Sequence, residues 1–230
     1  SKTTKKDNYD ASFYAVKSKI ESAGNILSIF ARASKQLNNQ DDANTIFEVE
    51  YSQYLKGEFE YIKHWDLDRK KEFAIRSFVG LAIPYGNSKS IPFSRSYFSG
   101  GSNDNRAWQP YSLGPGSSGG INDFNEANMK LSLNAEFRFN IFDKFNGALF
   151  ADMGNIWNFL DDTEDESYKF KGLESLKEIA LGSGLGVRYD QGLFVVRFDL
   201  GFKTYNPSRL ENDRWFREIN LSKSVLNIGI

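Results

Sequence analysis

The sequence predicts an all-β fold, a transmembrane antiparallel β-barrel, from three observations. Apolar and polar residues alternate along several long segments, long and short connections alternate between those segments, and aromatic residues gather near the segment ends. A barrel strand crosses a bilayer with ~10 residues, of which every second one is apolar. No apolar run approaches the ~20 residues that a transmembrane helix needs, so strands are the elements that we expect to span.

Residues 130–141, KLSLNAEFRFNI, show the alternation most clearly. Apolar side chains occupy every odd position, and polar or charged side chains occupy every even one. A period of two separates the two faces of a strand, and no helix could segregate the residues in this way. A strand of this length extends ~40 Å, about twice a typical soluble strand, and when tilted by ~40° it crosses the hydrocarbon core.

We expect eight strands of this kind, of which the first fits either a strand or a helix period. They are residues 9–21, 47–61, 73–85, 130–141, 145–157, 179–189, 193–205 and 220–230. Long connections (22–45, 86–128, 158–178, 206–219) alternate with short ones (66–72, 142–144, 190–192). Bacterial barrels show this rhythm of tight periplasmic turns and extended extracellular loops, whereas a Greek-key sandwich would not sort its loops by length.

Aromatic residues lie where the strands should meet the two membrane interfaces. Those near the short turns are Trp65, Phe142, Phe145 and Tyr189, and those near the long loops are Tyr85, Trp157, Phe159, Tyr205 and Trp215. Two aromatic girdles of this kind anchor a barrel at the level of the lipid headgroups. The single histidine, His64, lies beside Trp65 at a strand end, and we expect it to be solvated or interfacial.

The composition excludes several classes of protein. Aromatics make up 15% of the chain while charged residues reach 26%, a mixture that suits a sheet whose faces meet different solvents. The formal net charge of −1 supplies no field that would attract nucleic acid. Because there is no cysteine, one histidine and no nucleophile–base spacing, we expect no enzyme, no metal site and no cofactor. The GSGLG run at 182–186 has no lysine or helix after it, which favours strand packing over a phosphate loop.

The longest connection, residues 86–128, is expected to fold back into the lumen. Its apolar side chains would be costly to leave in water, and Gly100 and Gly101 permit a sharp turn that would place Arg106 near the tip. An arginine inside a barrel needs carboxylates, and one guanidinium can bind two of them through its planar fork. Glu136 and Asp152 lie on the polar faces of the next two strands. Further inward charges that compete as partners are Arg138, Arg188 and Asp199.

The loop and the two strands after it resemble a known family. YFSGGSNDNRAWQPYSLGPG is similar to the loop of the BamA/TamA superfamily of outer-membrane assembly proteins, the bacterial surface antigen family. That loop carries an aromatic residue, Gly-Gly and Ser, then a Val-Arg-Gly-aromatic tetrapeptide and a Leu-Gly-Pro. NAEFRF resembles the family's Glu-Leu-Arg-Phe strand, and FADMGNIW resembles its Phe-x-Asp-x-Gly-Asn-x-Trp strand. The wording NRAWQPYSLGPG is most similar to the TamA-like assembly lipoproteins of Bacteroidota.

The resemblance, which covers the chain from about residue 51 to its end, implies roles for particular residues. Arg106 would be the loop-tip arginine, and Glu136 and Asp152 its partners on the barrel wall. The other residues of the loop motif would be Gly100, Gly101, Trp108, Gly114 and Pro115. Two departures stand out: NRAW replaces Val-Arg-Gly-aromatic, and the chain stops at NIGI without the family's terminal aromatic residue. We therefore expect a different backbone at the loop tip and a few residues missing after Ile230.

The resemblance also implies an architecture. Three strands before the loop and five after it fit the C-terminal half of the family's sixteen-stranded barrel. We accordingly expect residues 1–230 to be the C-terminal part of an outer-membrane β-barrel, with loop 86–128 folded into the lumen. The N-terminal POTRA domains and the first half of the barrel would lie outside this sequence, whose start, SKTTKKDNYD, is no signal peptide.

By resemblance, the expected function is to help other proteins insert into or cross the bacterial outer membrane through a lateral seam between the first and last strands. The last strand, with its asparagine and glycine, should pair weakly there. The expected partners are the lipid bilayer, unfolded outer-membrane or secreted proteins, and accessory lipoproteins or a periplasm-spanning protein. A passive channel or dedicated secretion transporter of the same superfamily is the alternative. A soluble lipocalin-like barrel would need apolar residues in the lumen, where Glu136, Arg138 and Arg188 are expected.

Overall fold

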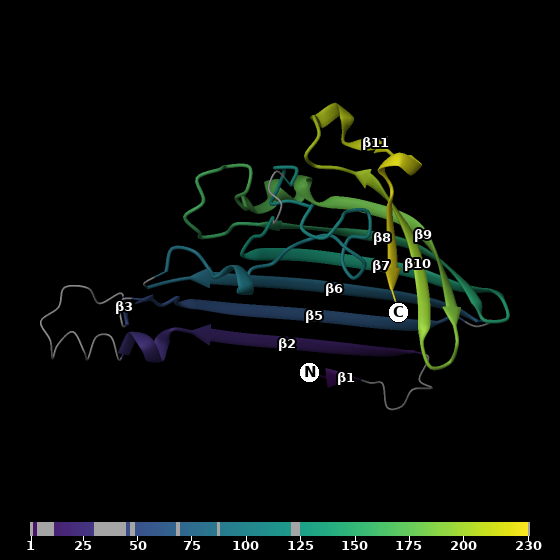
Figure 1. Ribbon diagram of the computed structural model, residues 1–230, viewed down its shortest axis with the longest axis horizontal. Helices are drawn as coiled ribbons and strands as arrows, with labels where there is room; N and C mark the ends of the chain where they lie inside the picture. Colours follow the sequence, from purple (N-terminus) through teal and green to yellow (C-terminus); the bar gives the residue numbers. More distant parts are fainter. Residues whose placement is uncertain are drawn as a thin grey trace, which may run out of the picture.

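A strongly curved antiparallel sheet forms the body of the molecule (Figure 1). The computed structural model describes residues 2–3, 12–29, 45–46, 49–67, 70–86, 88–120 and 125–229. The strands of the sheet follow the order β1-β2-β5-β6-β7-β8-β9-β10-β11, and β12 also pairs with β10. The confirmed fold class is thus all-β and antiparallel, and within the described residues the sheet remains open, as part of a barrel.

The long strands run close to the ranges that the alternation predicts. They are β2 (Phe13–Ala23), β5 (Tyr54–Asp66), β6 (Lys71–Pro84), β7 (Met129–Phe142), β8 (Phe145–Trp157), β9 (Ala180–Asp190) and β10 (Val195–Tyr205). The shorter strands are β1 (Lys2–Thr3), β3 (Thr45–Ile46), β4 (Val49–Glu50), β11 (Trp215–Glu218) and β12 (Val225–Gly229). Short 3-10 helices lie in the connections: η1 (Phe93–Arg95), η2 (Gly172–Glu178), η3 (Glu211–Asp213) and η4 (Leu221–Lys223).

Two predicted strand boundaries are wrong, and each has a local cause. The second long strand begins at Tyr54 rather than at residue 47, because residues 49–50 pair with residues 45–46 in a separate hairpin. The last strand begins at Val225 rather than at residue 220, because Asn220 caps η4 by accepting a hydrogen bond from the backbone N–H of Lys223. Positions 9–11 and 47–48 of the predicted strands lie outside the described residues.

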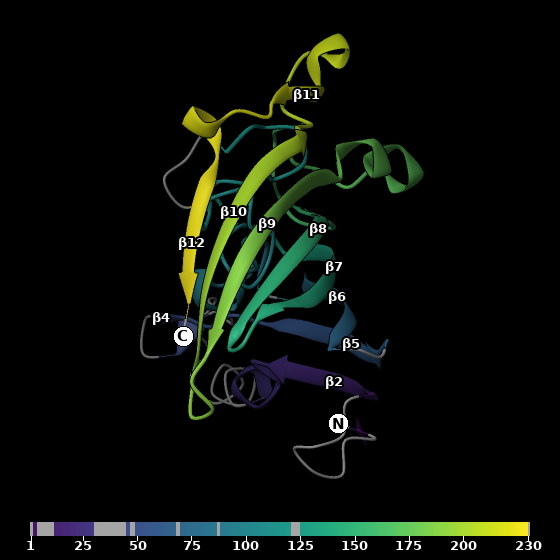
Figure 2. The same cartoon turned by 90° about the vertical axis from the view of Figure 1, so that its right-hand side faces the viewer.

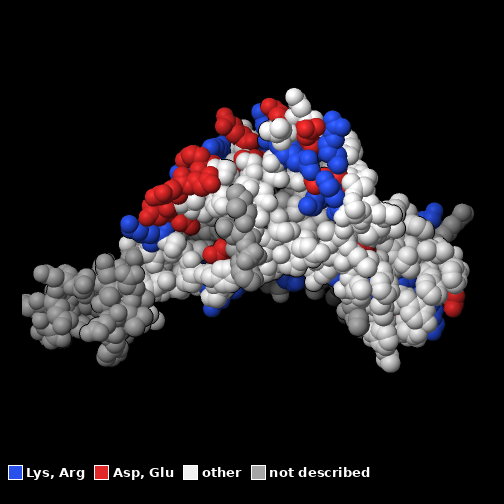
Figure 3. Space-filling model, turned by 45° about the horizontal axis from the view of Figure 1, so that its top comes forward, with Lys and Arg blue, Asp and Glu red and all other residues white. Residues whose placement is uncertain are grey.

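The two faces of the sheet differ as the period of two requires. Apolar side chains such as Leu55, Val79, Leu149, Leu185 and Phe198 are exposed on the outer face, where a bilayer would cover them. Asp152, Asp199, Glu136 and Arg188 are buried on the opposite face. Charged side chains otherwise gather over the long connections at the top of the view in Figure 3, and much of the remaining visible surface is uncharged.

The aromatic residues near the short turns pack against one another. Phe145 contacts both Phe142 and Tyr189, with ring centroids 4.9 and 4.8 Å apart, and Trp65 stacks on Phe73. Trp157, expected at the other interface, is instead fully buried. Its indole N–H donates to the Glu178 carboxylate because the connection after β8 folds back over the ring. No helix in the described part of the chain is long and apolar enough to cross a membrane.

Residues 88–120 of the long connection run inside the curve of the sheet (Figure 2). Its middle is buried: Asp104, Asn105, Arg106, Ala107 and Trp108 are all shielded from solvent. The loop therefore forms the interior against which the concave, polar face of the sheet packs.

Candidate functional site

The site is the tip of this loop, and a tight turn creates it. Gly100 has a φ of 101°, a left-handed conformation that glycine adopts without strain, and a methyl group there would lie 2.1 Å from the carbonyl oxygen of Gln109. The backbone N–H of Gly101 donates to the Trp108 carbonyl at 2.8 Å, which closes the lobe. Asp104 stabilises the turn by accepting hydrogen bonds from the Ser99 hydroxyl and the Gly100 N–H. Arg106 lies within this lobe.

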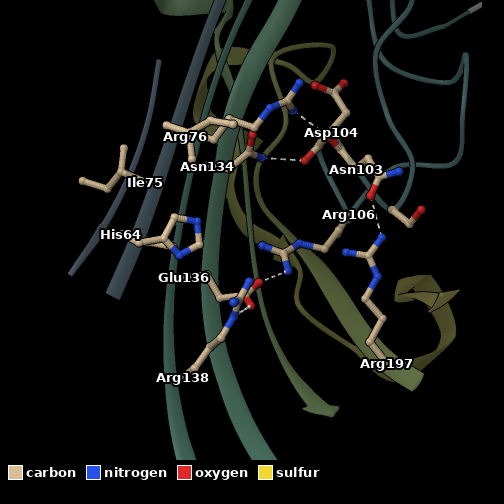
Figure 4. A pocket seen from close by; sticks show the side chains of 13 residues that line it. His64, Ile75, Arg76, Asn103, Asp104, Arg106, Asn134, Glu136, Arg138 and Arg197 are labelled. Atoms are coloured by element: carbon tan, nitrogen blue, oxygen red, sulfur yellow. Dashed lines mark hydrogen bonds and ion pairs between the residues drawn. The ribbon is translucent and has the colours of Figure 1, made fainter. Parts of the chain in front are cut away.

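Arg106 projects from the lobe onto the inner wall. Its Nε and Nη2 donate to the two carboxylate oxygens of Asp152 at 2.8 and 3.0 Å, and its backbone N–H donates to the same carboxylate at 3.1 Å. Its Nη1 donates to Glu136 (Figure 4). The central carbon of the guanidinium also lies over the ring of Phe150, 3.6 Å from the centroid. The structure thus brings together the three residues that the sequence singled out.

Three further charges join the same network. Arg188 donates to both oxygens of Glu136 at 3.1 Å and also pairs with Asp199. Asp199 lies 3.6 Å from Nη1 of Arg106. Arg138 donates from Nε to Glu136 at 2.6 Å. Sequence reasoning left these residues as competing partners, whereas the wall holds them all in one network of ion pairs with Arg106, Glu136 and Asp152. Arg138, at the partly exposed side of the network, also pairs with Glu72 at 3.1 Å.

Asparagines complete the attachment, and sequence reasoning missed them. Asn134 donates both to Asp152, at 2.9 Å, and to the Asp104 carbonyl, at 2.6 Å. Asn227, on β12, donates to the carbonyl of Arg106 at 2.9 Å. The sequence did hold a signal for Asn134: it lies two residues before Glu136 on the same strand, so its side chain points to the same inner face.

The second half of the loop motif, Trp108, Gly114 and Pro115, lies where β8 ends and β9 begins. Trp108 is buried with Ala107, Leu113 and Ala180. A methyl group at Gly114 would lie 2.3 Å from Oδ1 of Asn155, so the backbone approaches β8 closely there, and the adjoining Pro115 is fully buried. Asn155 also donates to the Gly116 carbonyl at 2.7 Å. The motif residues therefore fix the loop at two separate points on the wall.

His64, expected to be solvated or interfacial, lies on the lumenal side near the end of β5 and is partly exposed. It pairs with Glu72, its ring stacks on Phe13 with centroids 4.4 Å apart, and it lines a cavity of about 400 Å³ with Arg76, Asn103 and Arg197 (Figure 4). The alternation of β5 explains the placement, because residue 64 shares the inward phase of the strand's other even positions. Within the described residues, no group of three acidic or histidine side chains is arranged to hold a metal ion.

At the end of the sheet that carries the long connections, Glu218 anchors the connection that leads to β12. Its carboxylate accepts a hydrogen bond from the side-chain amide of Asn206 at 2.6 Å. It also forms ion pairs with Arg209 at 3.0 Å and with Lys223 at 3.5 Å. Burial alone would raise the pKa of Glu218, but the hydrogen bonds from Arg209 and Asn206 outweigh it and lower that pKa to about 2. The carboxylate is therefore ionised at any physiological pH.

The fold and the fastened internal loop define a class, the bacterial outer-membrane β-barrels with a loop anchored in the lumen. The family model for the Omp85 superfamily domain matches residues 10–221, so the chain belongs to the Omp85 superfamily and is an outer-membrane protein. This confirms the predicted membership of the BamA/TamA superfamily, while the closer likeness to the TamA-like proteins of Bacteroidota stays a prediction.

Among solved structures, BamA from Haemophilus ducreyi lacking POTRA domains 1–3 matches this chain with a TM-score of 0.53 and 14% sequence identity. The match covers 76% of this chain and 34% of that one, so the present chain spans about a third of the matched protein. At this identity the likeness concerns the fold. No curated protein sequence matches the chain.

Proposed function

We propose that this chain is the catalytically inert, strand-accepting part of an outer-membrane factor that helps other proteins insert into or cross the membrane. The observation that carries the proposal is the contrast between a firmly fixed lumenal loop and a last strand built from poor strand formers. β12 pairs with β10 from Val225 to Gly229, and its inward positions include Asn227 and Gly229, which stabilise a ladder weakly. No other described strand pairs with β12.

A strand with one unpaired edge presents backbone N–H and C=O groups to any extended segment. A substrate strand could add there by edge pairing, with main-chain hydrogen bonds that do not depend on the substrate's sequence. The network around Arg106 would keep the loop against the wall while the last strand exchanges partners. In this account the arginine has a structural role, and no covalent step, metal or cofactor is involved.

The partners follow from the same account. We propose unfolded outer-membrane or secreted proteins as substrates, the lipid bilayer as the medium, and an accessory lipoprotein or periplasm-spanning protein as a delivery partner. The apolar outer face of β12, with Leu226 and Ile228 exposed, would carry an added strand directly into contact with lipid.

Photo-crosslinking tests the proposal. A benzoylphenylalanine at position 228, in the full-length protein in living cells, should capture newly made barrel strands. The same probe at position 185, on the outer face of the internal strand β9, is the matched control and should capture none. Equal capture at both positions, or none at 228, would contradict a seam at the last strand.

The alternative is a channel or a transporter for one secreted partner. It is favoured by a cavity of about 1200 Å³ at the short-turn end, whose lining includes several charged side chains, among them Lys71, Lys144, Arg138, Glu72 and Asp190. Single-channel recording separates the two: a large steady conductance supports the pore, and small flickering openings support a barrel plugged by its loop.

A further inference from the structure

The inner face of β12 contacts the loop tip through Asn227. This side chain is buried, and its amide donates a 2.9 Å hydrogen bond to the main-chain carbonyl oxygen of Arg106. The carbonyl can reach β12 because Gly201, on the neighbouring strand β10, has no side chain: a methyl group there would lie 2.3 Å from that oxygen. Arg106 is therefore bound in two directions, by its guanidinium to β7 and β8 and by its carbonyl to the last strand.

A second contact lies two residues further along β12. Gly229 pairs in register with Arg197 of β10, and a methyl group at Gly229 would lie 2.4 Å from Nε of that arginine. The arginine passes over the glycine and donates from Nη2 to the side-chain oxygen of Asn103 at 2.5 Å (Figure 4). The carbonyl of Asn103 accepts from Nη1 of Arg76 on β6 at 2.8 Å. The loop tip thus lies between β6 on one side and β10 with β12 on the other.

These contacts explain why β12 carries Asn227 and Gly229, two residues that weaken its pairing as a strand. Asparagine and glycine are poor strand formers, and each loses ladder stability relative to a β-branched residue. In β12 they occupy the inward positions that meet the loop, while Leu226 and Ile228 occupy the outward ones. Because these two residues stabilise the ladder weakly, the buried hydrogen bond from Asn227 to the loop contributes to holding the strand.

We propose that Asn227 and Gly229 are positioning residues that dock the last strand on the loop tip, so that the Arg106 carbonyl sets how firmly β12 pairs with β10. The consequence for strand exchange rests on the proposed function. Loosening this contact frees β12 to exchange its partner, and tightening it holds the seam closed. The docking itself concerns only contacts within this chain.

Hydrogen exchange on the full-length protein in lipid nanodiscs tests the docking. Asn227→Leu removes the donor at nearly constant size, and Asn227→Asp places a carboxylate against the carbonyl oxygen. Both should speed exchange in residues 225–229 about five- to tenfold, the effect of losing one buried hydrogen bond, and leave residues 129–157 unchanged. Leu226→Val, on the outer face of the same strand, is the control and should exchange as wild type.

Gly201→Ala should break the same hydrogen bond between Asn227 and Arg106, because the added methyl group would push the Arg106 carbonyl away. We expect the same faster exchange, so this variant keeps the test possible if the Asn227 variants fail to fold. Wild-type exchange of residues 225–229 in the folded variants would overturn the docking. So would a loss of protection spread evenly over all strands, because that is the signature of general destabilisation rather than of a local contact.

Photo-crosslinking at position 228 then separates this inference from the proposed function. If Asn227→Leu speeds exchange and raises strand capture above the wild-type level, the docking controls the seam. Faster exchange without capture in any variant leaves the docking in place and removes the proposed function. Capture that occurs while exchange of residues 225–229 is unchanged supports the proposed function and overturns the docking.

Discussion

The carboxylate of Asp152 binds both the side chain and the backbone of Arg106. Two hydrogen bonds come from the guanidinium and a third from the main-chain N–H, so one wall residue fixes the position and the orientation of the loop tip. Asp152 is fully buried and Arg106 is nearly so. Removing either residue would leave the other charge without its main partner, away from water.

Arg106→Ala should lower the free energy of unfolding by about 3–5 kcal/mol, because buried carboxylates lose their shared cation. Denaturant unfolding in detergent, followed through tryptophan fluorescence, measures the loss. Arg217→Ala is the control, since Arg217 forms an exposed ion pair with Asp213 and should change stability little. Equal stability of the two variants would show that the buried network contributes nothing.

Asp152→Asn should be destabilising alone but much less so in the background of Arg106→Ala. The asparagine keeps the size of the side chain yet turns one acceptor toward the arginine into a donor. Residues in one network couple, and we expect an interaction energy of about 1–3 kcal/mol from the double-mutant cycle. Additive losses in unfolding free energy would mean that the contact between Arg106 and Asp152 is energetically neutral.

Gly182→Val should displace the loop tip without touching a charge. A Cβ at Gly182 would lie 2.4 Å from Oδ1 of Asn105 and 2.7 Å from Cβ of Ala107. Hydrogen exchange of residues 101–116 should accelerate strongly. Gly57→Val, on β5, is the control because nothing lies within 4 Å of its Cβ position. If both variants protect the loop as wild type does, the glycines of β9 are not required for loop packing.

Acid should loosen the connection between β10 and β12 through Glu218. The pKa of this carboxyl is about 2 in the folded protein, below its ordinary value of 4.5. A depressed pKa contributes stability that is complete above pH 4.5 and is lost as the pH falls toward 2. Fluorescence of Trp215, on β11, should report the transition between those values, and Glu218→Gln should remove it. Identical titrations of wild type and variant would assign the transition to another group.

Much of the fold could be predicted because the barrel strands alternate. β8 has the predicted bounds, and the inward phase of Glu136 and Asp152 followed from the same period. The resemblance then pointed to the arginine at the loop tip. The boundaries that failed depended on local features with no periodic signal, such as the cap of η4 by Asn220.

The full membership of the site could not be predicted in the same way. The second arginine bound to Glu136 is Arg188, which reaches it from β9. That contact depends on the register between strands that are distant in sequence. Asn227 contacts Arg106 across 121 positions of chain, and its sequence signal was a poor strand former within the last strand. Trp157 was misplaced because alternation does not reveal that a later connection folds over the ring.

The most direct test of the account is a reconstitution. The purified full-length protein in liposomes should accelerate the folding of a urea-unfolded outer-membrane barrel protein into the same membrane. Arg106→Ala should abolish the acceleration, and Arg217→Ala should retain it. Folding of the client no faster than in empty liposomes, with a large steady conductance in its place, would contradict the account and support a channel.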